Sequence, residues 1–192
     1  MDLTAYLRIQ AHANALSNHR LGQALRALDP AAWQAPRTSF FPSLARTLDH
    51  VLAVDQYYIG ALHRDQRLRE RYAAFEPSAD AAEWVGRQHG SDLRLVDFCA
   101  ALDAAAIDAW VEMPRSDHVQ RDRVGHVLAH LFNHQTHHRG QVHAMLAGTA
   151  VAPPQLDEFM MPSEAHLRRA DMQALGWDEA EVYAIGPKPP PA

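Results

Sequence analysis

The sequence predicts an all-α protein, a four-helix bundle followed by a short C-terminal extension. Apolar residues recur at helical spacing through four long segments, and proline-bearing loops separate these segments. No segment indicates a strand persuasively. Because each long segment carries an apolar stripe, we expect the four helices to bury these stripes against one another.

The first two helices are delimited by proline. The first is predicted over residues 3–28 and ends at Asp29-Pro30, and the segment 31–39 is predicted to be a loop. The second is predicted to begin after Pro42 or Ser43 and to continue to about Arg69. A loop around residues 76–78 follows it.

The third helix is predicted to begin after Ser78, because Ser78 followed by Asp80 and Glu83 is typical of a capped N-terminus. It is expected to end before Met113-Pro114. Gly86 and His89-Gly90 leave open whether this stretch is one helix or two. Its expected core residues are Leu93, Val96, Leu102 and Ile107.

A loop with Ser116 and Asp117 leads into the fourth helix, which is predicted to end near Gly148. We therefore assign residues 1–162 to the bundle and residues 163–192 to the extension. Within the extension, Ser163–Leu175 is expected to form a short helix, and the proline-rich composition of Gly186–Pro191 predicts a disordered tail.

Composition excludes several classes of protein. A net charge of -5 and a pI near 6.2 give no basic surface for nucleic acid. The single cysteine, Cys99, excludes an internal disulfide framework and is expected to be a packing residue. The N-terminus lacks the pattern of a secretion signal, and no apolar run approaches the roughly 20 residues of a membrane span. We expect a cytoplasmic protein.

Histidine is concentrated in the fourth helix, where six of the 13 histidines lie between His126 and His143. His134 and His138 are four residues apart, a spacing that places two imidazoles side by side for one metal ion. On a helical wheel, they lie roughly 80° and 40° from the centre of the apolar stripe, whereas His130 and His137 lie roughly 120° or more away. The alternative is that both are histidines at the edge of the core, satisfied by hydrogen bonds.

The chain also resembles a known family. Residues 133–141, N-H-Q-T-H-H-R-G-Q, are similar to the N-H-x-T-H-H-R-G-Q signature of the DinB family of damage-inducible metal proteins. Residues 48–55, L-D-H-V-L-A-V-D, resemble the family's L-N-H-x-x-x-x-D stretch on its second helix, and residues 14–21 resemble its first helix. The resemblance implies up-down helices with one long connection.

The resemblance further implies a divalent metal ion bound by His50, His134 and His138, for which we expect zinc or nickel. His50 lies roughly 140° from the apolar centre of its helix, so the residues alone favour an exposed position for it. A secondary line through His50, Val54 and Tyr57 could instead face another helix of the bundle.

Three neutral histidines leave coordination positions open for water or a small-molecule ligand. The residue after His134 is Gln135, so the motif lacks the carboxylate of an H-E-x-x-H peptidase. Gln141 and Asp55 are candidates to orient an imidazole, although Asp55 could equally be an ordinary polar position. His137 is expected to have a structural or interface role.

Two functions remain open. The first is a metal-dependent enzyme acting on a small molecule by hydrolysis or, as the resemblance suggests, by transfer of a low-molecular-weight thiol. The second is a non-catalytic metal-binding stress-response protein. No catalytic residue is assigned. The resemblance also implies a homodimer.

Overall fold

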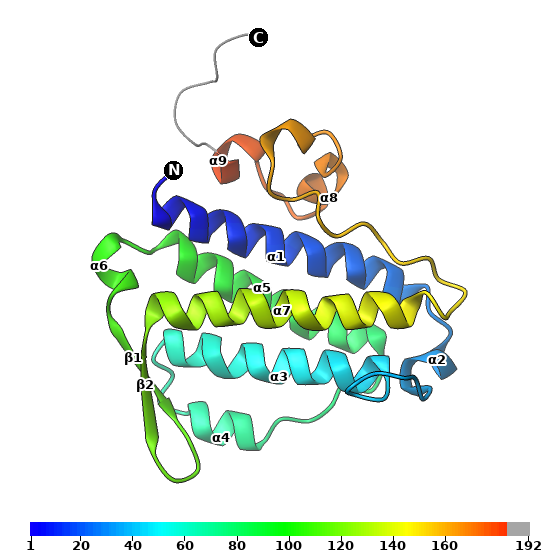
Figure 1. Ribbon diagram of the computed structural model, residues 1–192, viewed down its shortest axis with the longest axis horizontal. Helices are drawn as coiled ribbons and strands as arrows, with labels where there is room; N and C mark the ends of the chain where they lie inside the picture. Colours follow the sequence, from blue (N-terminus) through cyan, green and yellow to red (C-terminus); the bar gives the residue numbers. More distant parts are fainter. Residues whose placement is uncertain (184–192) are drawn as a thin grey trace.

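Four long helices lie side by side along the length of the molecule in the computed structural model, which describes residues 1–183 (Figure 1). They are α1 (Leu3–Arg26), α3 (Leu44–Leu62), α5 (Ala81–Ala100) and α7 (Val124–Leu146). The predicted helix-bundle fold is confirmed. The expected disordered tail, Gly186–Pro191, lies outside the described residues.

The direction of the helices follows from their connections. α1 and α7 run one way and α3 and α5 run the other way, so α3 and α5 are parallel (Figure 1). Their link, residues 63–80, runs back along the bundle and carries the short helix α4 (Leu68–Ala73) (Figure 1). α1 packs most extensively on α5, whereas α3 packs on both α5 and α7. Because α3 has two neighbours, two of its faces point into the protein.

Side-chain caps begin three of these helices. The carboxylates of Asp2 and Asp80 and the hydroxyl of Ser43 each accept a hydrogen bond from a backbone N–H in the first helical turn. Such caps satisfy donors that the helix itself leaves unpaired, and each contributes about 1 kcal/mol. The predicted starts of the second and third helices therefore agree with the structure to within a few residues.

The second helix ends earlier than predicted, at Leu62 rather than near Arg69. Arg64 has a φ of 55°, a left-handed conformation that cannot continue an α-helix. A turn follows, and Leu68 and Arg69 belong to the separate helix α4. The predicted loop 31–39 also contains a short helix, α2 (Pro30–Gln34), which Asp29 caps.

The third predicted helix was wrong beyond Ala100. α5 is continuous through Gly86 and Gly90, and the chain then forms α6 (Ala104–Ile107) and two antiparallel strands, β1 (Trp110–Pro114) and β2 (Val119–Arg123). The expectation of no strand was therefore also wrong. β1 alternates exposed and buried residues, but five residues are too few for this period to stand out in the sequence.

The core agrees with the prediction at most positions. Leu93 is an exception: it is 36% exposed because Leu95, Val96 and Cys99 occupy the face of α5 that points inward. Both main apolar clusters include residues of α1, α3, α5 and α7. The apolar stripes from which the helices were predicted therefore form the core of the bundle.

The chain returns to α1 after the bundle. Phe159 and Met172 pack with Ile9 and Leu16, and α9 (Glu179–Tyr183) adds to this third apolar cluster. The segment also contains a short 3₁₀ turn, η1 (Pro162–Glu164), and α8 (Arg169–Ala174). These elements cover the outer side of α1 (Figure 1).

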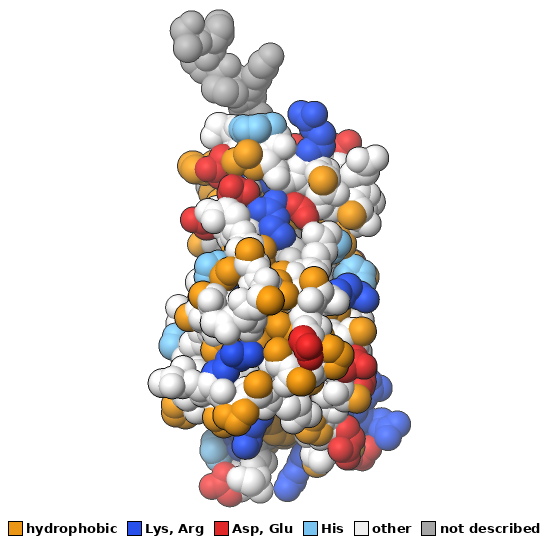
Figure 2. Space-filling model, turned by 90° about the vertical axis from the view of Figure 1, so that its right-hand side faces the viewer, with side chains coloured by type: hydrophobic (Ala, Val, Ile, Leu, Met, Phe, Trp, Pro, Cys, Tyr) orange, Lys and Arg blue, Asp and Glu red, His pale blue; other side chains and the backbone are white. Residues whose placement is uncertain are grey.

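The end of the bundle next to α2 shows acidic, basic and hydrophobic side chains interspersed (Figure 2). No single charge dominates this face, in agreement with a protein of modest net negative charge. None of the helices within residues 1–183 combines the length and the apolar character that crossing a membrane requires.

Candidate metal centre

Three histidines from two helices meet on one side of the bundle. α3 supplies His50, and α7 supplies His134 and His138, with one nitrogen of each ring within 4.8 Å of the others. The Nε2 atoms of His50 and His134 are 3.0 Å apart. His138 is buried, and the other two are partly exposed. Three imidazoles this close together could hold a metal ion.

One hydrogen bond fixes the orientation of His138. Its Nδ1–H donates to Oε1 of Gln141, 2.8 Å away and nearly one helical turn further along α7. The lone pair of this ring is then on Nε2, where it is free to bind a cation. The Nδ1 of His134 is buried and has no hydrogen-bond partner within residues 1–183, so this nitrogen does not fix the orientation of the ring.

All three rings favour the neutral form that coordinates a cation. Burial, together with the nearby His138 and His50, lowers the pKa of His134 to about 3. Burial also lowers the pKa of His50 and of His138. Neutral imidazoles without a carboxylate or thiolate suit the divalent ions of the later first transition series, such as zinc and nickel, better than calcium or magnesium.

Comparison with known proteins agrees with this arrangement. The sequence model of the DinB family matches residues 9–171, which include all three histidines. The chain belongs to the DinB family. It is also 27% identical to Protein DinB of Bacillus subtilis (strain 168) over 148 residues, which cover 73% of this chain and 85% of that protein.

The other histidines of this DinB-family helix lie outside the cluster. His126, His130 and His137 are exposed, as their wheel positions predicted. The ring of His130 nevertheless lies 5.7 Å from that of His134, and His137 lies 4.8 Å from His138. His130 and His137 thus lie beside the cluster of three histidines without being part of it.

Phe41 is a residue of the centre that sequence reasoning missed. Its ring lies 4.5 Å from the ring of His50 and 5.8 Å from that of His138. It belongs to the loop before α3, where no periodicity exists to indicate which side chains turn inward. Phe40, beside it, is 81% exposed and packs edge-on against Phe41.

Asp55 does not orient an imidazole. Its side chain is buried between helices, where the side-chain amides of Gln88 and Gln135 donate to Oδ2. Burial and the nearby carboxyl of Asp92 raise the pKa of Asp55 well above its usual range. Asp55 therefore acts on the centre only through Gln135, the neighbour of His134.

Asp92 and Arg139 complete this buried polar network. The amides of Asn18 and Gln88 donate to the carboxyl of Asp92, and Arg139 donates to Asn18 and Gln135. The network joins all four long helices next to the side of α7 that carries His134 and His138. Hydrogen bonds between helices at this depth fix the register of α7, and hence the position of its histidines.

Cys99 is not part of any site. It is buried in the apolar core, and burial raises the pKa of its thiol to about 12. A thiol with so high a pKa is not a nucleophile near neutral pH. This agrees with its predicted role as a packing residue.

Proposed function

We propose that His50, His134 and His138 bind one divalent ion, zinc or nickel, and that the protein uses it to act on a small molecule. The reaction we propose is hydrolysis or transfer of a low-molecular-weight thiol. The observation that carries the proposal is the set of three imidazoles within 4.8 Å of one another, two of them partly exposed to solvent. An ion bound by three side chains, two of which border the solvent, keeps positions for an exogenous ligand.

A bound divalent cation supplies Lewis acidity, which makes water or a thiol nucleophilic near neutral pH. The protein's own contribution is to hold the imidazoles neutral and fixed. Gln141 orients His138, and the ring of Phe41 covers His50. Phe41 also makes one wall of the centre apolar, which favours the hydrocarbon part of an organic ligand over bulk water.

The second function, non-catalytic metal binding in a stress response, has one observation in its favour. No carboxylate within residues 1–183 forms a hydrogen bond or ion pair with any of the three imidazoles. A general acid or base is thus missing from the immediate surroundings of the centre. A test of whether exogenous ligands bind to the ion distinguishes the two functions, because the proposed enzyme needs an open coordination position.

Elemental analysis of the purified protein tests metal binding. We expect about one divalent ion per chain, and we expect His50→Ala, His134→Ala and His138→Ala each to lose most of it. His137→Ala is the matched control, since His137 lies on the same helix but is exposed. Full occupancy in both α7 ligand variants would disprove the site.

We also propose that the protein forms a homodimer through α1 and α7. A cavity of about 570 Å³ lies between the first half of each helix. Leu3 (54% exposed) and Tyr6 (38% exposed) line it, together with the partly buried Phe132. A second copy packed here would cover this apolar surface by two-fold symmetry.

A further inference from the structure

A second cavity lies on the opposite side of α3 from α7. It has a volume of about 520 Å³, within the range of small-molecule sites, and α3, α4 and α5 form its walls. Ala53 and Gln56 line it from α3, whereas His50 points to α7. None of the three metal-centre histidines borders it. Its occupant is thus independent of the proposed metal.

Positive charge is concentrated in this cavity, although the chain as a whole has a net charge of -5. Arg71, Arg87 and Arg94 line it, and the carboxylate of Asp65 is its one acidic side chain. Asp65 pairs with Arg71 at 3.2 Å. Three cations and one anion give the lining side chains a net charge of +2.

Among the three arginines of the cavity, Arg94 has the guanidinium that is most available to bind a ligand. Its guanidinium forms no hydrogen bond or ion pair within residues 1–183. The side chain of His63 contacts the backbone carbonyl of Arg94 and not its guanidinium. Arg87 is more constrained, since it donates to the carbonyl of Glu76 and lies 3.6 Å from Glu83, which is outside the cavity.

Aromatic rings complete the wall. Tyr57 and Tyr72 lie 4.9 Å apart, and Tyr72 is half exposed. Phe75 lies beneath the guanidinium of Arg87, 4.8 Å from its carbon. Such surfaces stack against planar rings, and the arginines bind anionic oxygens.

The side chain of Ser91 is a further indication that the ligand is polar. It is 4% exposed and lines the cavity, yet its buried Oγ has no hydrogen-bond partner among the described residues. A buried hydroxyl without a partner is costly, and a ligand oxygen in the cavity would satisfy it. Beside it, a Cβ added to Gly90 would meet no atom within 4 Å, so α5 leaves this part of the cavity open.

We propose that this cavity binds a small organic anion that carries an aromatic ring. The anionic group pairs with Arg94 and accepts a hydrogen bond from Ser91, and the ring packs against Tyr57, Tyr72 and Phe75. Charge selects the anion, and the aromatic wall selects the planar part of the ligand.

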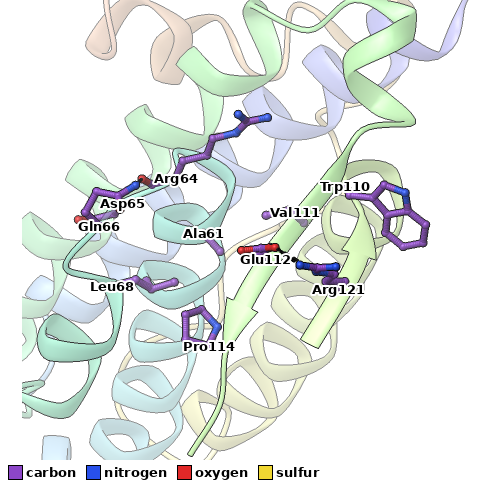
Figure 3. A pocket seen from close by; sticks show the side chains of 10 residues that line it. All are labelled: Ala61, Arg64, Asp65, Gln66, Leu68, Trp110, Val111, Glu112, Pro114 and Arg121. Atoms are coloured by element: carbon purple, nitrogen blue, oxygen red, sulfur yellow. Dashed lines mark hydrogen bonds and ion pairs between the residues drawn. The ribbon is translucent and has the colours of Figure 1, made fainter. Parts of the chain in front are cut away.

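The neighbouring cavity lacks this combination. It has a volume of about 740 Å³ and lies between β1 and the α3–α4 turn (Figure 3). It shares Asp65 and Leu68 with the cavity between α3, α4 and α5. Its Arg121 pairs with Glu112 at 2.7 Å (Figure 3). None of its lining residues carries a buried side-chain polar atom without a partner.

Calorimetric titration of the full chain with phenyl phosphate tests the proposal. Inorganic phosphate provides the charge without the ring, and phenol provides the ring without the charge. We expect phenyl phosphate to bind at one site per chain and at least tenfold more tightly than either. The titration is repeated with His138→Ala, and the same affinity there shows that the phosphate does not bind at the metal centre.

Two variants locate the site. Arg94→Gln is expected to weaken binding of phenyl phosphate by about tenfold or more, and Gly90→Leu to abolish it by filling the cavity. Gly86→Leu is the control, because Gly86 lies one turn earlier on α5, also has open space around its Cβ, and does not line this cavity. Circular dichroism checks that each variant is folded. No binding at millimolar concentration, or unchanged binding in both Arg94→Gln and Gly90→Leu, would overturn the proposal.

Discussion

His50 and His134 are 84 positions apart in the sequence, yet their Nε2 atoms lie 3.0 Å apart across the interface of α3 and α7. Two imidazole nitrogens at this distance either share one proton or present their lone pairs to a common cation. The first arrangement leaves His138, whose ring lies 4.9 Å from that of His50, without a role in the pair. A shared cation, as proposed above, would explain the convergence of all three rings.

Gln141 should matter for metal affinity although it is not a ligand. Gln141→Ala removes the acceptor for Nδ1–H of His138, so the ring loses its fixed orientation and affinity should fall roughly 10- to 100-fold. Gln141→Glu keeps an acceptor and should retain most of the affinity. Competition with a chromophoric chelator measures both. Equal losses in the two variants would point to a packing role for Gln141.

Phe41 should control which exogenous ligands reach the ion. In a cobalt-substituted sample, we expect small thiols and azide to change the visible spectrum, and Phe41→Ala to strengthen the binding of bulky thiols more than that of azide. Phe40→Ala is the control, since Phe40 packs on Phe41 and not on a histidine. If saturating thiol, azide and carboxylate all leave the wild-type spectrum unchanged, the ion has no open position and the non-catalytic function is favoured.

The two α7 histidines could be predicted from the sequence because their relationship is local. A spacing of four residues on one helix fixes two side chains relative to each other before any tertiary structure forms. His50 could not be placed in this way. Its position away from the apolar centre of α3 indicated exposure, and only the contact of α3 with both α5 and α7 gives it a partner. His50 was assigned to the site from the family resemblance and not from the periodicity of its helix.

The hairpin and the buried network escaped prediction for related reasons. β1 and β2 are five residues each, so neither shows a clear period, and their pairing depends on register across a turn. Asp55, Asp92 and Arg139 look like ordinary polar positions along their helices. Their burial becomes visible only when four helices are assembled.

Tyr6 should be important for dimerisation. We expect light scattering to give a mass near twice 21.4 kDa for the wild type. Tyr6→Glu would place a charge in the apolar α1–α7 cavity and should yield a monomer with unchanged helix content. Tyr72→Glu offers a comparison, since Tyr72 is similarly exposed but lies on α4. A monomeric wild type at micromolar concentration would rule out the dimer.

Asp92 should make stability fall as the pH rises. Burial raises the pKa of its carboxyl to about 7 from 3.8, so between about pH 4 and pH 7 the native state holds a proton that the unfolded chain releases. The stability linked to this proton is fully present below pH 4 and is lost as the pH rises through 7. Asp92→Asn cannot titrate, so the free energy of unfolding of the wild type minus that of the variant should decrease between pH 5 and pH 7.

The size of this effect is bounded by one proton, at most about 1.4 kcal/mol per pH unit. Urea unfolding of the metal-free protein at several pH values measures it, with Asp97→Asn as the control because Asp97 is exposed on the same helix. Asp92→Asn loses part of the hydrogen bonding to Asn18 and Gln88, so its stability is lower throughout and only the change with pH is diagnostic. Parallel curves for the wild type and Asp92→Asn would show that Asp92 is already ionised in the folded protein at pH 5, with Arg139 balancing its charge.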